Sequence, residues 1–105
     1  MKAAFIHANV IDVLERKTLI DQTVLIEEGR ICAVGPQLDT AGYQIEDLGG
    51  KYLSPGFFNM HVHTTVSAST DSNFHAYTPV ESTLLSLENL ASYIRSGVTF
   101  VRDVG

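Results

Sequence analysis

The sequence has 105 residues, of which 45% are hydrophobic and 18% charged, a composition typical of a folded domain with one modest core. Its 12 acidic residues outnumber 7 basic ones, which gives a net charge of -5, and Lys and Arg form no cluster. These properties argue against disorder, and against a nucleic acid or an anionic membrane as partner.

The cysteine content and the lack of long apolar stretches favour the cell interior. Cys32 is the single cysteine, so no internal disulfide can form, and its apolar surroundings predict a small buried side chain. Residues 1–7 lack the apolar core and cleavage site of a leader, and no segment reaches membrane-spanning length. We therefore expect a soluble, cytoplasmic protein in a reducing compartment.

Residues 1–56 predict a set of short antiparallel strands, because β-branched and aliphatic runs alternate with turn residues. Segments 23–27 and 30–34 flank Glu28-Gly29, where the glycine can supply the positive φ of a tight hairpin. A further strand is expected at 44–48. The first half of the chain is therefore predicted to be a β region.

After residue 56 the pattern changes to strand, helix, strand. Residues 57–63 form a strand-like apolar run, 78–96 have a helical period, and 98–101 form a second apolar strand. This order is typical of a parallel sheet, whose strands read as continuous apolar runs. In both the doubly wound sheet and the (β/α)8 barrel, chemistry gathers at the C-terminal ends of such strands.

Several signals agree on the limits of the helix. Thr78 is placed as the N-cap, Pro79 as the first helical residue, and Glu81 as the partner that closes a capping box. Gly97 is suited to the C-terminal cap. The helix carries one apolar stripe at alternating spacings of four and three residues, widened by Leu85 and Leu90: Val80, Leu84, Leu87, Ala91 and Ile94.

Two histidines lie at the end of the first of these strands. Side chains alternate across a strand, so His61 and His63 point to the same side and Val62 to the other. Neutral imidazole is a good ligand for zinc and related metals, and a strand end can hold two rings where one metal ion bridges them. The His-x-His motif alone is weak, because histidine often has a purely structural role.

The surroundings of this pair resemble a known family. Pro55–His63 is similar to the signature of the amidohydrolase superfamily, in which Pro-Gly introduces the first barrel strand and His-x-His closes it. Residues 24–34 look like the N-terminal hairpin of that family, and residues 96–105 look like its second barrel strand. The Thr-x-x-Arg-Asp-x-Gly form at 99–105 is most similar to imidazolonepropionase-like enzymes and Xaa-Pro dipeptidases.

The resemblance implies a fold class of mixed β followed by α/β. Residues 1–56 would form part of a small β-sandwich, which the family builds from both ends of a longer chain. Residues 57–105 would form the first strand, helix and strand of a TIM-type (β/α)8 barrel, which needs about 250 residues when complete. We therefore expect an N-terminal fragment of a metal-dependent hydrolase that acts on C–N bonds in amides, cyclic amides or dipeptides.

The resemblance also assigns the metal site. His61 and His63 would bind one or two divalent metals, with zinc expected, and metal-activated water would attack the substrate. A catalytic zinc usually has three protein ligands, and the family's later lysine or glutamate, histidines and catalytic aspartate cannot be assigned here. We therefore expect weak or absent metal binding and no activity from this segment alone.

Five further residues are candidates for contacts around the metal or with substrate. The family commonly has aspartate where Asn59 stands, so this position keeps a hydrogen-bonding side chain but loses the charge. His75 and Tyr77 precede the helix, where a solvated loop side chain and packing against the helix start are the respective alternatives. Arg102 and Asp103 point to opposite sides, and a structural ion pair or hydrogen bond is the alternative to a role beside the metal ligands.

A second hypothesis is a non-catalytic β-rich oligomerisation or binding module with a vestigial histidine pair. Two parallel strands without further neighbours would expose backbone donors and acceptors, and the helix stripe would lack part of its cover. This predicts self-association through the strand edges. One variant places the histidine pairs of two chains around a single metal.

Overall fold

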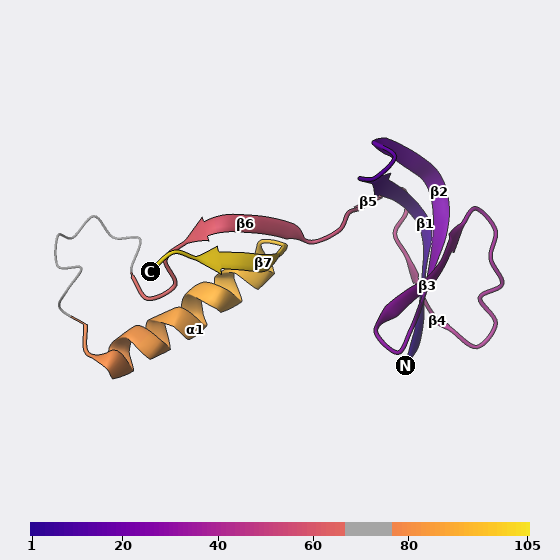
Figure 1. The fold of residues 1–105 in the computed structure, drawn as a ribbon. Helices are drawn as coiled ribbons and strands as arrows, with labels where there is room; N and C mark the ends of the chain where they lie inside the picture. The colour runs from indigo at the N-terminus through magenta and orange to yellow at the C-terminus, as the bar shows by residue number, and fades with distance from the viewer. Residues whose placement is uncertain (67–76) are drawn as a thin grey trace. The chain divides into compact units, whose positions relative to one another are not determined.

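The computed structural model describes residues 1–66 and 77–105, in which seven strands and one helix form two compact units, Met1–Pro55 and Gly56–Gly105 (Figure 1). In chain order the elements are β1 (Lys2–Asp12), β2 (Lys17–Glu27), β3 (Arg30–Gly35), β4 (Gln44–Asp47), β5 (Tyr52–Leu53), β6 (Phe57–Val62), α1 (Pro79–Arg95) and β7 (Val98–Asp103).

The first unit is a five-stranded sheet. Its order is β3-β2-β1-β4, and the short β5 also pairs with β1. β2 is antiparallel to both β1 and β3, whereas β4 and β5 run parallel to β1. The prediction of antiparallel strands was therefore wrong for β4 and β5. Only β2 and β3 follow hairpins, and the connection at residues 36–43 carries the chain back to the end of the sheet where β1 begins.

The hairpin between β2 and β3 confirms the predicted turn. Glu28 and Gly29 connect the paired residues Glu27 and Arg30, and both have positive φ, 52° and 75°. Positive φ at both central residues is the type I′ geometry, whose twist matches that of the flanking strands. The left-handed backbone therefore includes Glu28 as well as the expected glycine.

Irregular pairing between β1 and β2 places a histidine beside an aspartate. The register shifts on either side of Ala8, and His7 and Asp21 have φ of 52° and 53°. His7 Nδ1 lies 3.0 Å from Asp47 Oδ1, and this contact raises the pKa of the exposed imidazole. The pKa of Asp47 is lowered, first by the backbone N–H of Gly49 and then by His7.

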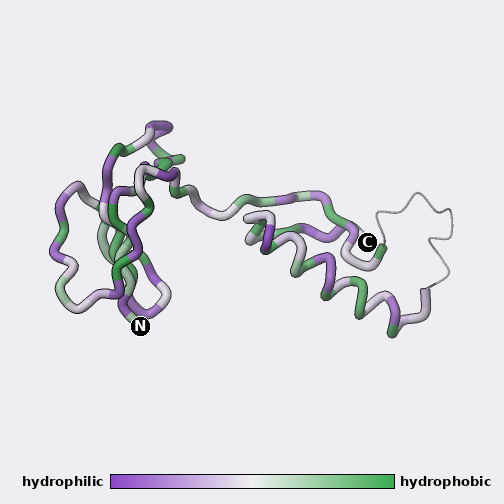
Figure 2. The backbone as a smooth tube through the Cα atoms, turned by 180° about the vertical axis from the view of Figure 1, so that it is seen from behind, coloured by the Kyte–Doolittle hydropathy of each residue, from purple (hydrophilic) through white to green (hydrophobic). Residues whose placement is uncertain are grey.

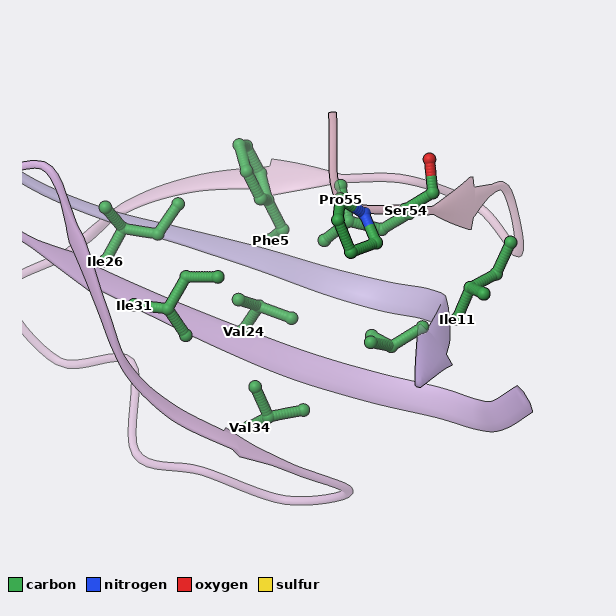
Figure 3. Close-up of a pocket in the computed structure, with 10 residues that line it drawn as sticks. Phe5, Ile11, Val24, Ile26, Ile31, Val34, Ser54 and Pro55 are labelled. Carbon is green, nitrogen blue, oxygen red and sulfur yellow. The ribbon is translucent and has the colours of Figure 1, made fainter. Parts of the chain in front are cut away.

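The first unit contains a small apolar core and an open apolar groove. Ala4 and Ala8 are fully buried, and Val24 is 1% exposed. A groove of about 230 Å³ extends from Val24 across the sheet to Ile31 and Val34, which are 66% and 42% exposed (Figure 3). Part of the apolar side of this sheet is therefore open within the described residues.

Cys32 is exposed, so the prediction of a buried thiol was wrong. It lies on β3, which forms one edge of the sheet and has mostly exposed side chains. Its Sγ donates a hydrogen bond to the carbonyl oxygen of Leu25 at 3.3 Å. An apolar run on an edge strand does not guarantee burial, because only one neighbouring strand covers it.

The second unit has the predicted order of strand, helix and strand. β6 and β7 pair in parallel, and α1 runs beside them (Figure 1). The rings of Phe58 and Phe100 stack across the pair with centroids 4.8 Å apart. β7 continues past the apolar run at 98–101 and ends at Asp103, where the second strand was expected to end.

Gly56 lets the chain pass close to β7. A Cβ atom at this position would lie 2.1 Å from Thr99 Oγ1 and 2.7 Å from Thr99 Cβ. These separations are far below van der Waals contact, so any side chain would displace one of the two strands. The glycine of the Pro-Gly motif is therefore required by a neighbour on the second strand.

The ends of α1 match the predicted caps. Thr78 Oγ1 accepts a hydrogen bond from Glu81 N at 3.3 Å, and Glu81 Oε2 accepts one from Thr78 N at 2.8 Å. The hydrogen bonds from Thr78 lower the pKa of Glu81. At the other end, Gly97 has φ of 82° directly after the C-cap residue Ser96.

The apolar stripe of α1 is exposed in the described structure, as expected for a helix with few neighbours. Figure 2 shows hydrophobic residues recurring along this helix. Val80, Leu84, Leu87 and Ile94 are each more than 60% exposed. The half-buried side chains lie on a different face of the helix: Ser82, Leu85, Ser86, Asn89 and Tyr93. Among the described residues, no helix is both long and apolar enough to cross a bilayer.

Candidate functional site

The two predicted ligands converge at the C-terminal end of β6. His61 lies on the strand and His63 follows its last residue, and both side chains are exposed. His61 Nε2 and His63 Nε2 are 3.3 Å apart, with the ring planes at 73°. The structure therefore shows the same-side arrangement that strand alternation predicts.

This separation fits a shared metal ion. Two nitrogen ligands of a tetrahedral zinc, each about 2.0–2.1 Å from the metal, lie about 3.3–3.4 Å apart. His63 Nδ1 is hydrogen-bonded to the oxygen of Gly105, so its Nε2 is the nitrogen that faces His61. The donor set is incomplete, because the described residues contain no group of three His, Cys, Asp or Glu side chains that could hold a metal.

Asp103 lies beside the pair and binds backbone and hydroxyl donors. Its Oδ2 accepts hydrogen bonds from Thr64 Oγ1 and from Thr64 N, the latter at 3.2 Å, and its Oδ1 accepts one from Gly105 N at 3.0 Å. The pKa of Asp103 is lowered, first by the Thr64 hydroxyl, then by the N–H groups of Gly105 and Thr64, and last by His63. Asp103 is thus hydrogen-bonded both to Thr64, the residue after His63, and to the backbone of Gly105.

Thr64 is the residue near the site that sequence reasoning missed. It is 9% exposed, the second best-buried side chain in the described part of unit two after Val62. A threonine directly after a His-x-His strand carries no distinctive sequence signal. The signal that could have found it is the expected pairing of β6 with β7, which places the end of one strand near Asp103 on the other.

Asn59 contacts the backbone of a candidate ligand. This half-buried residue accepts a hydrogen bond from His61 N through its Oδ1 at 3.2 Å. Such a local bond from Asn or Asp to the N–H two residues ahead is a common backbone-holding device. An aspartate could make the same bond, so the loss of charge leaves this contact intact.

Two further candidate residues, Arg102 and Tyr77, are exposed. Arg102 is exposed, and the described residues show no ion pair at its guanidinium. Tyr77 is 43% exposed and lies just before the N-cap of α1. His75 lies outside the described residues. Of the alternatives expected for Arg102 and Asp103, no ion pair is seen among the described residues, whereas Asp103 accepts hydrogen bonds.

The sequence is similar to curated enzymes. It is 34% identical to an adenine deaminase from Bacillus pumilus over 96% of this chain and 17% of that enzyme. It is also 34% identical to an N-substituted formamide deformylase from Arthrobacter pascens, over 75% of this chain and 15% of the enzyme. A dihydroorotase from Macrococcus caseolyticus is 37% identical over 49% of this chain and 12% of its own length. No protein-family profile matches the sequence.

Solved structures share the fold over the whole chain. A prolidase crystallised with N-methylphosphonate-L-proline is 28% identical, with a TM-score of 0.88 over 100% of this chain and 26% of its own. A protein named amidohydrolase is 25% identical, with a TM-score of 0.86 over 100% of this chain and 26% of its own. The chain matches the N-terminal region of the amidohydrolase superfamily.

This amidohydrolase match confirms the resemblance seen in Pro55–His63. The prolidase among the structural neighbours agrees with the dipeptidase-like branch expected from residues 99–105. The strand-rich first unit agrees with the N-terminal β-sandwich of these neighbours. The chain spans 17% or less of the length of the curated relatives described above.

Proposed function

We propose that this chain supplies two ligands of a divalent-metal site in a hydrolase that acts on C–N bonds. The similar proteins are named adenine deaminase, dihydroorotase, formamide deformylase and prolidase, and each name describes a reaction at a C–N bond. The supporting observation is the 3.3 Å separation between His61 Nε2 and His63 Nε2. The substrate class is an amide, a cyclic amide or a dipeptide.

Within this proposal the chain's own residues bind and orient. His61 and His63 hold the metal, zinc by ligand type, and Asn59 holds the backbone of His61. When bound, such a metal lowers the pKa of a water molecule and polarises a carbonyl group. Residues 57–105 would form the first unit of a (β/α)8 barrel, with residues 1–56 in the β-sandwich. Further ligands would come from the later part of a complete hydrolase.

Metal titration of the purified chain tests the ligand assignment. We expect weak zinc binding, because two protein ligands are fewer than the usual three. His61→Ala and His63→Ala should each abolish it, whereas His7→Ala, which removes an exposed histidine of the first unit, should leave it unchanged. Binding that survives both substitutions, or that is lost in His7→Ala, would contradict the assignment.

Hydrolysis assays test the activity of the segment. The 105-residue chain should not turn over N-acyl amino acids, cyclic amides or Xaa-Pro dipeptides when zinc is supplied. A longer polypeptide that adds the remaining superfamily ligands should hydrolyse at least one of these classes. Turnover by the short chain that disappears in His63→Ala would show that two histidines suffice, and would refute the expected inactivity.

The exposed apolar side chains favour a second candidate, a self-associating module without catalysis. The stripe of α1 and the stacked Phe58 and Phe100 are largely open in the described structure. Patches of this kind commonly mark interaction surfaces. Sedimentation of the metal-free chain would show a mass that rises with concentration, and Leu84→Glu would reduce it. A monomer at all concentrations would exclude this candidate.

A further inference from the structure

Asp103 ties the last residues of unit two to the segment that follows β6. One carboxylate oxygen accepts both the hydroxyl and the N–H of Thr64, and the other accepts the N–H of Gly105. Thr64 is buried, and Val104 N donates to Val62 O at 3.1 Å between the same two segments. The carboxylate therefore fixes the position of the Gly105 backbone relative to the end of β6.

The position of Gly105 in turn fixes the imidazole of His63. His63 Nδ1 is hydrogen-bonded to the oxygen of Gly105 (Figure 1 shows the chain end beside the end of β6). A carbonyl or carboxylate oxygen at this position can only accept, so Nδ1 must carry the proton. In the neutral ring Nε2 then has a free lone pair, the form that a metal ligand requires.

The segment that follows β6 is also hydrogen-bonded to α1. Asn89 on α1 donates through Nδ2 to the carbonyl oxygens of Thr64 and Val66, at 2.8 and 3.1 Å. Thr64 is thus hydrogen-bonded through its side chain, its N–H and its carbonyl oxygen at once. Such multiple bonding around a buried side chain leaves little freedom for the residue next to His63.

We propose that Asp103 and Thr64 are positioning residues that hold His63 in the Nδ1–H tautomer through Gly105, with Nε2 preset for a metal. The expected effect of this positioning on metal affinity rests on the proposed function, whereas the tautomer of His63 does not. Partners behind a metal-binding histidine commonly change metal affinity by about 10- to 100-fold when they are removed.

The tautomer of the His61 ring is not fixed for metal binding in the same way. The described contacts of its ring are with His63, Nε2 to Nε2 at 3.3 Å. Since His63 Nε2 has the lone pair, the metal-free hydrogen bond requires a proton on His61 Nε2. Metal binding then requires that proton to move to His61 Nδ1, with no net change in protonation. The two ligands should therefore respond differently to the metal.

Nitrogen NMR of the two imidazoles tests this inference without any assay of activity. At alkaline pH, where imidazoles are neutral, the metal-free chain should show His63 protonated at Nδ1 and His61 at Nε2. Addition of zinc should change the tautomer of His61 and leave that of His63 unchanged. His63 predominantly protonated at Nε2 in the metal-free chain would overturn the proposal.

Matched variants separate positioning from general folding. Asp103→Asn and Thr64→Val should mix the tautomers of His63 and weaken zinc binding by about 10-fold. Thr64→Ser keeps the hydroxyl and should restore both readouts. Asp39→Asn alters a comparable bond to Ala41 N in the first unit and should change neither.

Amide shifts of β6 and β7 identify any variant that loses the strand pair. If Asp103→Asn loses the pairing of β6 with β7, the comparison of Thr64→Val with Thr64→Ser tests the positioning role instead. An unchanged His63 tautomer in folded Thr64→Val and Asp103→Asn would overturn the inference even if zinc still binds. A tautomer that shifts in these variants, in a chain that binds no zinc, would support the positioning role and contradict the zinc binding expected of the histidine pair.

Discussion

The two units of this chain are stabilised by different kinds of interaction. In the first unit, Ala4, Ala8, Val24 and Leu25 are buried within a five-stranded sheet. In the described part of the second, Val62 is the single buried apolar side chain, and the other buried residue is Thr64. Both lie next to His63. Burial in the described part of the second unit is therefore concentrated next to the candidate site, where hydrogen bonds take the place of a large core.

The largest expected effect tests the close approach in the second unit. Gly56→Ala places a methyl group against Thr99, and overpacking of this kind costs about 1–3 kcal/mol. Hydrogen exchange should show faster opening of the β6 and β7 amides. Thr99→Gly added to Gly56→Ala should recover part of the protection that the single variant loses. Full protection in Gly56→Ala alone would show that the strands can shift apart without cost.

The core of the first unit offers the matching test. Val24→Ala removes the equivalent of two methylene groups from a fully buried site, which should cost about 2 kcal/mol. The loss is measured as a lower urea midpoint for the first-unit signals. Val34→Ala, at a position 42% exposed, is the control and should cost much less. Equal losses in the two variants would mean that the open groove is packed in solution.

A smaller effect is expected at the start of α1. Thr78→Ala removes the acceptor for Glu81 N and should cost about 1 kcal/mol of helix stability. Amide exchange in the first turn reports this loss directly. Thr83→Ala is the control, because its hydroxyl bonds within the helix to Pro79 O and alanine is a better helix former. A greater loss in Thr83→Ala would contradict the cap.

The smallest effect concerns the exposed His7–Asp47 contact of the first unit. The raised pKa of His7 means that its contribution is complete below its ordinary value of 6.5 and is lost as pH rises through the raised pKa. The lowered pKa of Asp47 means that its contribution is present above 3.8 and is lost as pH falls. First-unit stability should therefore decline from pH 6 to pH 8, as measured by urea unfolding.

His7→Gln is the control for this pH dependence. It should flatten the decline above pH 6 while leaving most of the loss at acid pH, because the N–H of Gly49 is the larger cause of the Asp47 shift. An unchanged slope above pH 6 in His7→Gln would assign the dependence to another group.

Local features of the fold were predictable, and features that depend on strand neighbours were not. The turn at Glu28-Gly29, the capping box of Thr78 and the convergence of His61 with His63 follow from backbone rules that act over a few residues. The parallel pairing of β4 and the exposure of Cys32 depend on which strand forms the sheet edge. No short pattern encodes that choice.

The same division applies within the candidate site. The histidine pair was found because His61 lies on β6 and His63 directly follows that strand, and Asp103 because it ends the next strand. Thr64 was missed because its partner is 39 residues away and meets it only once β6 pairs with β7. Sequence therefore predicted the groups that could bind a metal, but not the bonds that hold them.

The contact between Gly56 and Thr99 has a consequence for the evolution of related sequences. A Cβ at the first position and a branched side chain at the second cannot coexist at the separations seen here. Relatives with a larger residue at position 56 should therefore have glycine at position 99, or a wider strand spacing. The glycine of the Pro-Gly motif and a residue on the following strand should accordingly vary together, as a covarying pair, rather than independently.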